Sequence, residues 1–432
     1  MREGQPPPTT HVIGAGLAGL ACAVRLAGQG RPVALYEATD HGGGRARSFF
    51  DQALGRVIDN GNHLILSGNV ATQRYLREIG AAGTMISPSE AVYPFVDLRT
   101  GERWTVHPNR GRIPWWIFAP ARRVPQTRAR DYLAGLRLAT ADPSATVADC
   151  FQALGPAYER FWRPLAVAVL NTPPEEGAAR LLWPVIRLIF AKGEAASRPC
   201  LASNGLSASL VDPALAYLRA RGCTPAFNRR LRALAVENGC VAALRFGDDS
   251  IPVSPQDQVV VAVPPTAARE LIPDLAVPKE SNVIVNVHFL LPAPPPPLCG
   301  DGRILGIVGG TAEWLFLRGD IASVTVSAAS RLAEEEPATI AGKVWTEVVA
   351  ALGLGGPSAP PPYRVIKERR ATFAQTPDSL SLRPHTRTRI GNLFLAGDWT
   401  DTGLPATIEG AVTSGQRAAA AVLERAQRRG SP

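Results

Sequence analysis

Short apolar runs near both ends of the chain are each followed by a helical pattern of apolar residues. Residues 10–15 and 32–37 are predicted as strands, and residues 17–29 between them as a helix. This arrangement is a βαβ unit. Near the other end, an apolar run at 393–398 precedes a helical pattern over about 407–425. Strands that alternate with helices indicate an α/β fold.

The interior of the chain has a more varied pattern. Residues 207–221 are predicted as a helix, 224–263 as several short strands, 282–291 as a strong strand and 338–352 as an amphipathic helix. Residues 91–203 show a mixed pattern that is rich in Trp. Because 432 residues are too many for one compact core, we expect two or three packed units.

The composition is that of an ordinary soluble globular enzyme, with 46% hydrophobic and 19% charged residues. Lys and Arg number 46 against 37 Asp and Glu, so the chain is basic. A basic surface can face nucleic acid, anionic lipid or a phosphorylated cofactor, or it can simply be solvated. Since no nucleic-acid-binding motif accompanies the charge, we expect no nucleic acid partner.

Cysteine usage and hydropathy bear on location. The six cysteines show no C-x-x-C spacing, so we expect reduced, mostly buried thiols in a cytosolic protein. They are Cys22, Cys150, Cys200, Cys223, Cys240 and Cys299. The opening MREGQPPPTT does not resemble a signal peptide. No run reaches the roughly 18 to 20 apolar residues that span a bilayer, so any membrane contact would be peripheral. We also find no metal-binding cluster and expect no metal.

The most specific motif lies in residues 11–37, where Gly14-x-Gly16-x-x-Gly19 joins a strand to a helix and a second strand ends in Glu37. Gly14 permits a tight turn, Gly16 lets the backbone approach a pyrophosphate, and Gly19 lets the helix pack against the strand. The pyrophosphate then lies at the helix N-terminus, and Glu37 accepts hydrogen bonds from a ribose diol. A glycine-rich turn without a ligand is the alternative, but the complete context disfavours it.

A second glycine-rich segment, GGGRARS at residues 42–48, follows Glu37. A strand ending in Glu and followed by G-G-R-x-x-S resembles the glutathione-reductase-type flavoproteins, in their amine oxidase and carotenoid desaturase branch. The resemblance implies that this loop passes the pyrophosphate of the cofactor and that Arg45 neutralises it, a role that suits a planar guanidinium. Plain surface charge is the alternative for Arg45 and Arg47.

The sequence NLFLAGDWTDTGLPATIEGAV, near the C-terminus, resembles the last flavin motif of the same branch. The resemblance implies that Asp398 bonds the ribityl chain or a group beside the pyrophosphate. It also implies that the helix N-terminus at Ile408–Ala411 faces the pyrimidine edge of the flavin. Residues 226–234 resemble the strand that lies against the adenine, with Leu231 as the contact. The cofactor would then be FAD, in a cavity made by both ends of the chain.

The resemblance therefore implies an α/β protein, a glutathione-reductase-type FAD-binding Rossmann domain with an inserted mixed α+β substrate domain. The FAD-binding domain is expected at residues 9–90, 204–268 and 386–428, and the substrate and membrane-facing domain at 91–203 and 269–385. The residues expected to bind FAD are Gly14, Gly16, Leu17, Ala18, Gly19, Glu37, Ala38, Gly43, Gly44, Arg45, Asn60, Gly61, Asn62, His63, Leu231, Gly397, Asp398, Ile408 and Ala411.

The segment DNGNHLILSG, together with GGGRARS and GDWTDTGLPATIEGAV, is similar to one family in particular. This family is the squalene-associated FAD-dependent desaturases, or hydroxysqualene dehydroxylases, of hopanoid synthesis. The similarity covers about residues 11–425, with specific motifs at the two ends and a match by pattern between them. The family usually has Gln where this chain has Asn62.

This resemblance implies an FAD-dependent oxidoreductase that converts hydroxysqualene to squalene by reductive dehydroxylation. Protonation of the allylic hydroxyl and loss of water would leave a resonance-stabilised cation, which takes hydride from reduced flavin. Such a site needs an apolar tunnel, an acid near the leaving oxygen and the exclusion of water. His63, with an ordinary pKa of about 6.5, and Asp401 are the candidate acids. A histidine that only bonds its own loop is the alternative for His63.

A hydrophobic isoprenoid substrate would arrive from the membrane, so we expect a cytoplasmic protein that lies peripherally on the inner face. The segment 115–118 (WWIF), with Arg122 and Arg123, has the composition of an interfacial anchor, and 181–192 is similar. Ordinary core packing is the alternative for both segments. Upstream prenyl synthases are candidate partners, and the oligomeric state stays open.

Two other functions remain compatible with the motifs. A carotenoid-type desaturase or an amine oxidase on the same fold would run the flavin in the other direction. An amine oxidase usually places a lysine near the flavin, and this chain has few: Lys192, Lys279, Lys343 and Lys367. A non-catalytic FAD-binding protein of a lipid-synthesis complex is the second alternative.

Overall fold

Both ends of the chain meet in one parallel sheet. The computed structural model describes residues 7–295, 298, 302–355 and 359–430. The parallel sheet runs in the order β19 (Leu393–Leu395), β13 (Gln258–Val261), β1 (Thr10–Ile13) and β2 (Val33–Tyr36). Strands β1, β13 and β19 are fully buried, as expected for a parallel sheet covered on both faces.

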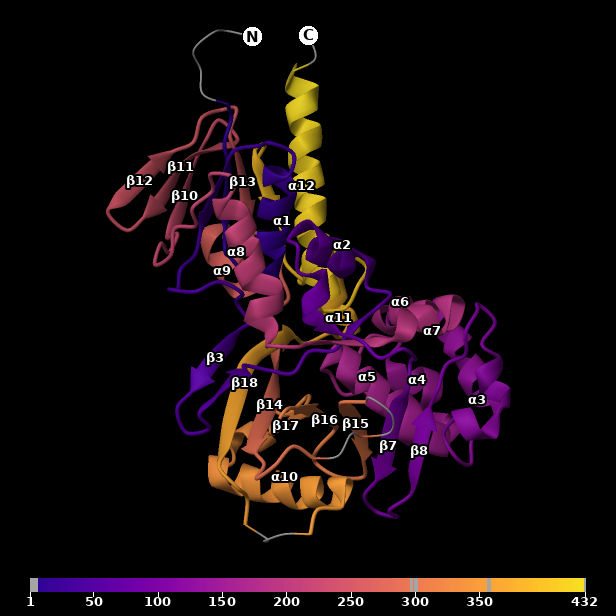
Figure 1. Cartoon of the computed structure of the whole chain (residues 1–432). Helices are drawn as coiled ribbons and strands as arrows, with labels where there is room; N and C mark the ends of the chain where they lie inside the picture. The colour runs from indigo at the N-terminus through magenta and orange to yellow at the C-terminus, as the bar shows by residue number, and fades with distance from the viewer. Residues whose placement is uncertain (1–6, 296–297, 299–301, 356–358, 431–432) are drawn as a thin grey trace.

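Two long helices cover one face of this sheet. Helix α1 (Leu17–Ala27) follows β1, and α12 (Ile408–Gly430) runs beside it in the upper half of Figure 1. A side chain at Gly415 of α12 would overlap the carbonyl oxygen of Ala18 in α1. The two helices are therefore packed as closely as glycine permits, so the last helix of the chain is held against the first.

The upper half of the molecule contains further elements around the parallel sheet. A small antiparallel sheet has the order β10-β11-β12. Helix α9 packs near β10, α8 against α1, and α2 against α12. The bounds are β10 (Ala233–Glu237), β11 (Cys240–Phe246), β12 (Asp249–Pro252), α2 (Val70–Glu78), α8 (Asp212–Arg219) and α9 (Pro265–Leu271).

A larger mixed sheet forms the lower half. Its order is β18-β14-β17-β16-β15-β7-β8, and it is antiparallel except where β15 pairs with β7. Helix α10 (Pro337–Leu352) packs on one face of this sheet. The strands are β7 (Tyr93–Asp97), β8 (Arg103–Val106), β14 (Ser281–Leu290), β15 (Ile304–Val308), β16 (Trp314–Arg318), β17 (Ile321–Val326) and β18 (Tyr363–Phe373).

A group of short helices packs beside β7 and β8 around a second, aromatic-rich core. In this core, Phe151 and Trp162 stack with ring centroids 4.1 Å apart. The helices are α3 (Ala129–Leu133), α4 (Val147–Phe151), α5 (Arg163–Leu170), α6 (Ala179–Lys192) and α7 (Glu194–Ser197).

Several short elements complete the fold, with β3 and β4 in one small sheet and β5, β9 and β6 in another. They are β3 (Ser48–Asp51), β4 (Arg56–Asp59), β5 (Ile65–Leu66), β6 (Met85–Ile86), β9 (Pro199–Ala202) and α11 (Pro377–Ser381). Single turns of 3₁₀ or π helix lie at Ala82–Thr84, Trp115–Phe118, Pro120–Arg122, Ala134–Ala139, Gln152–Leu154, Tyr158–Trp162, Ser207–Val211 and Leu332–Glu334.

The α/β fold class and the βαβ start are confirmed, with element ends displaced by a few residues. The strand predicted within 226–234 is wrong over most of its length. Only Ala226 bridges to Tyr36, and a strand begins at Ala233. The turn at Asn228, which has a positive φ of 55°, breaks the extended path. Of the cysteines, Cys22, Cys150, Cys200 and Cys223 are buried free thiols, and Cys299 lies outside the described residues.

Candidate active site

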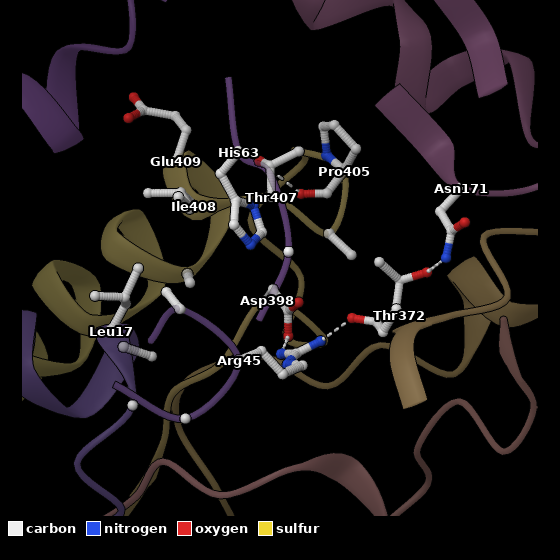
Figure 2. A pocket seen from close by; sticks show the side chains of 18 of the residues that line it. Leu17, Arg45, His63, Asn171, Thr372, Asp398, Pro405, Thr407, Ile408 and Glu409 are labelled. Carbon is white, nitrogen blue, oxygen red and sulfur yellow. Dashed lines mark hydrogen bonds and ion pairs between the residues drawn. The ribbon is translucent and has the colours of Figure 1, made fainter. Parts of the chain in front are cut away.

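A cavity of about 1120 Å³ lies at the carboxyl ends of the parallel strands and continues between the large sheet and helices α5 and α6. Both chain ends line it, as Leu17, Arg45 and His63 approach Asp398 and Ile408 in Figure 2. Ligands in open α/β sheets bind at the carboxyl ends of the strands, so the position is that of a nucleotide site. Every residue predicted to bind FAD lines this cavity except Gly19.

The three glycines of the β1–α1 turn have three different roles. Gly14 has a φ of +104°, and a Cβ there would lie 2.6 Å from the carbonyl oxygen of Ala262. A Cβ on Gly19 would overlap the carbonyl oxygen of Gly14, which explains a glycine that packs the helix without lining the cavity. A Cβ on Gly16 meets nothing within 4 Å. The space in front of Gly16 and the α1 N-terminus is therefore open to an anion.

The Glu37 carboxylate at the end of β2 is held in place by backbone groups. One oxygen accepts the Ala15 N–H at 2.8 Å, and the other accepts the Thr39 N–H at 3.0 Å. Glu37 lines the cavity with Ala38 beside it. Fixed in this way, the carboxylate can accept hydrogen bonds from a diol, which is the ribose-binding role predicted from the sequence.

Arg45 pairs with Asp398, the acid of the C-terminal motif, at 2.8 Å, and it also donates to the carbonyl oxygen of Ala371 at 2.7 Å (Figure 2). The neighbouring carboxylate raises the pKa of the guanidinium. Part of the Arg45 guanidinium is committed to Asp398 while Arg45 also lines the cavity, and its role beside the pyrophosphate stays a prediction. The two motifs, far apart in the sequence, meet through this ion pair.

The segment Asn60–His63 runs along the cavity between the two halves of the molecule. The Asn62 side chain donates to the Thr325 hydroxyl at 3.0 Å, and that hydroxyl donates to Asn286 at 2.9 Å. Since its amide nitrogen bonds the large sheet, Asn62 positions this segment, and the FAD-binding role predicted for Asn62 stays a prediction. Asn286 and Thr325 went unpredicted, although a polar residue within the apolar run NVIVNVHFLL was a usable signal.

His63 projects into the cavity (Figure 2). Desolvation lowers the pKa of its imidazole, and this outweighs the attraction of Asp59. The ring is therefore neutral at neutral pH, which suits a hydrogen-bonding group better than an imidazolium acid. The structure places His63 where the sequence predicted it, but weakens its candidacy as proton donor.

Asp401 is corrected. Its carboxylate is 47% exposed and is absent from the cavity lining. It accepts the backbone N–H of Gly403 at 3.2 Å within its own loop. A carboxyl that turns to the surface cannot reach a substrate in the cavity, so the catalytic role predicted for Asp401 is not supported.

The second half of the cavity is apolar. Aromatic and aliphatic side chains from the large sheet and from α5 and α6 line it, and a few polar groups, including Asn171, Thr325 and Ser327, stand among them. The apolar members include Tyr93, Phe95, Val106, Trp116, Phe161, Leu165, Val169, Val185, Leu188, Trp314 and Phe316. This end fits a long hydrocarbon with one polar group.

The segment 115–118 was predicted either as an interfacial anchor or as part of the core. In the structure, two of its side chains are buried and two are exposed. Trp116 and Ile117 are buried, whereas Trp115 and Phe118 are 48% and 65% exposed. Arg122 lies over the Trp115 ring, 5.0 Å from its centroid. In the other candidate segment, Leu181 and other α6 residues are buried. No helix among the described residues is long and apolar enough to cross a membrane.

The cavity fits the FAD that the sequence motifs imply. It offers an open helix N-terminus for a pyrophosphate, a fixed carboxylate for a ribose, and a second helix N-terminus at Ile408 and Ala411. No group of acidic, His or Cys side chains in the described ranges could hold a metal ion.

Comparison with known proteins gives consistent results. The profile of the family described as flavin containing amine oxidoreductase matches residues 17–423. Hydroxysqualene dehydroxylase of Sinorhizobium fredii is 46% identical over 96% of this chain and 98% of its own. The same enzyme of Rhodopseudomonas palustris is 46% identical over the same shares of the two chains.

Among solved structures, cyclohexylamine oxidase from Brevibacterium oxydans has a similar fold. Its TM-score is 0.70 at 19% identity, with 98% of this chain and all of that chain covered. At this identity the likeness concerns the fold alone. The substrate question therefore rests on the closer relatives and on the site.

Proposed function

The chain belongs to the flavin containing amine oxidoreductase family and, within it, to the hydroxysqualene dehydroxylases, and from this premise we propose that it reduces hydroxysqualene to squalene. It is an FAD-dependent oxidoreductase. Bound FAD, once reduced, supplies the hydride. The protein residues hold the cofactor, orient the substrate and exclude water.

The observation that carries this proposal is the continuity of the cavity. The nucleotide half, with Gly16 and Glu37, opens directly into the apolar half, which Phe95, Phe161 and Trp314 line. A C30 hydrocarbon chain can lie in the apolar half with its hydroxyl at the junction. Polar groups gather there, at Asn62, His63 and Thr325. An allylic cation formed at this junction would lie beside the apolar half of the cavity, away from bulk water.

The lining residues favour this reaction over amine oxidation. An amine oxidase usually brings a lysine near its flavin, and no lysine lines the cavity among the described residues. The apolar side chains that line the second half of the cavity cannot accept a proton from an amine substrate. A hydrocarbon alcohol is the better match to such a surface.

We propose further that the protein rests peripherally on the inner membrane face. Ile113, Trp115 and Phe118 are exposed, and Arg122 adds a cation beside them. The adjoining Trp116 lines the cavity, so this surface borders its apolar end. Aromatic residues at headgroup depth with nearby arginines favour an anionic lipid surface.

The function is tested by anaerobic incubation of FAD-loaded protein with a reductant and hydroxysqualene, with products identified by mass spectrometry. Squalene that forms only with the enzyme supports the proposal. Parallel incubations with a carotenoid precursor and with primary amines, under oxidising conditions, test the alternatives. Turnover of either, with hydroxysqualene left intact, would contradict it.

A further inference from the structure

The reaction needs an acid at the leaving hydroxyl, and the candidates identified from the sequence are poorly placed. His63 is held neutral by burial, which lowers its pKa. Asp398 is paired with Arg45, and Asp401 lies at the surface. A proton source must therefore be sought among the other groups around the cavity.

One carboxyl lies directly behind the cavity wall. Glu313, in the turn before β16, accepts the backbone N–H of Ser327 at 2.8 Å and is also hydrogen-bonded by the Ser327 side chain. Ser327 lines the cavity, as does Trp314 next to the glutamate. The Glu313 carboxyl thus contacts a residue that lines the cavity.

Ser327 stands at the functional end of the cavity. It lies two positions after Thr325, just beyond the end of β17, and both residues line the cavity. The Thr325 hydroxyl accepts a hydrogen bond from the side-chain amide of Asn62. Asn62 precedes His63 in the segment between the two halves. The Glu313–Ser327 pair is therefore near the junction where the proposed hydroxyl lies.

The surroundings of Glu313 favour a proton-carrying carboxyl. Desolvation raises its pKa to about 7, against the hydrogen bonds from Ser327. On the side of the helices, the positive charge of Arg163 acts to lower the pKa of Glu313, and Arg163 is itself paired with Glu175 at 3.1 Å. From the α10 side, Glu347 is occupied by backbone N–H groups of the preceding loop residues, at 2.6 and 2.8 Å.

We propose that Glu313 supplies, through the hydroxyl of Ser327, the proton that the leaving oxygen of the substrate takes up. The inference rests on the proposed dehydroxylation. Ser327 is the catalytic residue of this pair, since it faces the substrate, and Glu313 is the positioning residue that holds the proton behind it.

The step balances. The Ser327 hydroxyl proton moves to the substrate oxygen while the Glu313 proton moves to the Ser327 oxygen. The C–O bond breaks with both electrons on oxygen, so water leaves and an allylic cation remains. The hydride that completes squalene comes from the reduced flavin. Glu313, left as a carboxylate, regains its proton from water before the next turnover.

The chain offers a matched control in Glu347, which anchors the same loop from α10 but does not line the cavity. Glu313→Gln keeps an acceptor for the Ser327 N–H and removes the proton. With FAD-loaded protein, Glu313→Gln should lower kcat about 100-fold. The activity of the wild type should fall as pH rises through about 7, and Glu313→Gln should abolish this pH dependence. Glu347→Gln should keep the wild-type pH profile.

A second readout does not depend on turnover. Infrared difference spectra of the oxidised holoprotein should contain a protonated-carboxyl band that titrates near neutral pH and is missing in Glu313→Gln. Ser327→Ala should lower kcat while this band remains, and it carries the kinetic test if Glu313→Gln does not fold.

The outcomes separate the two claims. A wild type that makes squalene, with Glu313→Gln equal to it in rate and pH profile, would overturn this inference alone. An equal loss in Glu347→Gln would reduce Glu313 to a loop anchor and would also overturn it. A wild type that makes no squalene under reducing conditions would overturn the proposed function and this inference with it.

Discussion

Arg45 and Asp398 lie 353 positions apart in the sequence, and their side chains form an ion pair of 2.8 Å in the lining of the cavity. The carboxylate is 6% exposed and the guanidinium 38%. Each residue belongs to a motif that was predicted separately to bind the same cofactor. Their pairing shows that the first and last parts of the chain complete one site.

This ion pair predicts an asymmetric pair of variants. Arg45→Ala leaves the buried Asp398 carboxylate without its cation and should cost about 1–2 kcal/mol of apoprotein stability, since the pair is partly solvated. The double variant with Asp398→Asn should recover most of that stability while FAD affinity stays low. Thermal unfolding and flavin titration of both variants check this. If Arg45→Ala alone has wild-type stability, the ion pair does not stabilise the fold.

Gly16→Val should lose FAD and keep its fold. A Cβ at this position meets no protein atom within 4 Å, so the side chain fills only the space expected for the pyrophosphate. Flavin absorbance per protein and the Tm of the apoprotein are the measurements. Gly19→Val is the contrast, because its Cβ overlaps the Gly14 carbonyl and should prevent folding. Full flavin content in Gly16→Val would exclude this turn as the binding site.

His63→Ala should lower kcat about tenfold with flavin content unchanged. The neutral ring can orient a substrate hydroxyl by hydrogen bonding, but it is not the acid. Removing it should therefore leave the pH profile of kcat/KM in place. A profile that loses its alkaline limb in this variant would return the proton-donor role to His63.

Buried His288 predicts acid sensitivity of the fold. Desolvation lowers its pKa to about 4, against attraction by Asp59 and Asp51, and Arg318 adds to the lowering. The unfolded chain binds this proton below about pH 6.5, so stability should fall as pH drops from there to about 4, by on the order of 3 kcal/mol.

The measurement is urea unfolding at several pH values, with His288→Gln as the variant. His385→Gln is the matched control, because its side chain is 84% exposed. The variant at position 288 should lose part of the acid-dependent destabilisation, and the control none of it. Identical pH dependence in all three proteins would refute the burial argument.

Membrane contact predicts that Trp115→Ser with Phe118→Ser weakens co-sedimentation with anionic liposomes. Both side chains are exposed beside Arg122. Phe50→Ser is the control, since Phe50 is 62% exposed on β3. In Figure 1, β3 lies on the side opposite to α3, which packs against the 115–118 turn. Failure of the wild type to pellet, or equal loss in the control, would count against this surface.

The sequence was most informative where function depends on local backbone geometry. Gly14, Gly16 and Gly19 each act within a single turn, so their spacing identified the site before any fold was known. The Glu313–Ser327 and Asn286–Thr325 contacts depend on how β14, β16 and β17 align. Strand register is a long-range property, and one sequence does not reveal it.

The direction in which a side chain points is a second property that the sequence does not reveal. Asp401 follows the flavin motif closely, but its loop turns the carboxylate outward onto Gly403. In the turn at 115–118, neighbouring aromatic residues point to opposite sides, so Trp116 lines the cavity and Trp115 faces solvent. Composition identified the segment, and only the backbone path assigned its faces.

A single-turnover experiment tests the central claim most directly. Protein carrying reduced FAD is mixed anaerobically with hydroxysqualene, while flavin absorbance and squalene are followed together. For a hydroxysqualene dehydroxylase, we expect one squalene to form for each flavin oxidised, at the same rate. A flavin that stays reduced while hydroxysqualene remains intact would contradict this function. Reduction of oxidised flavin by hydroxysqualene, in a parallel incubation, would contradict it as well.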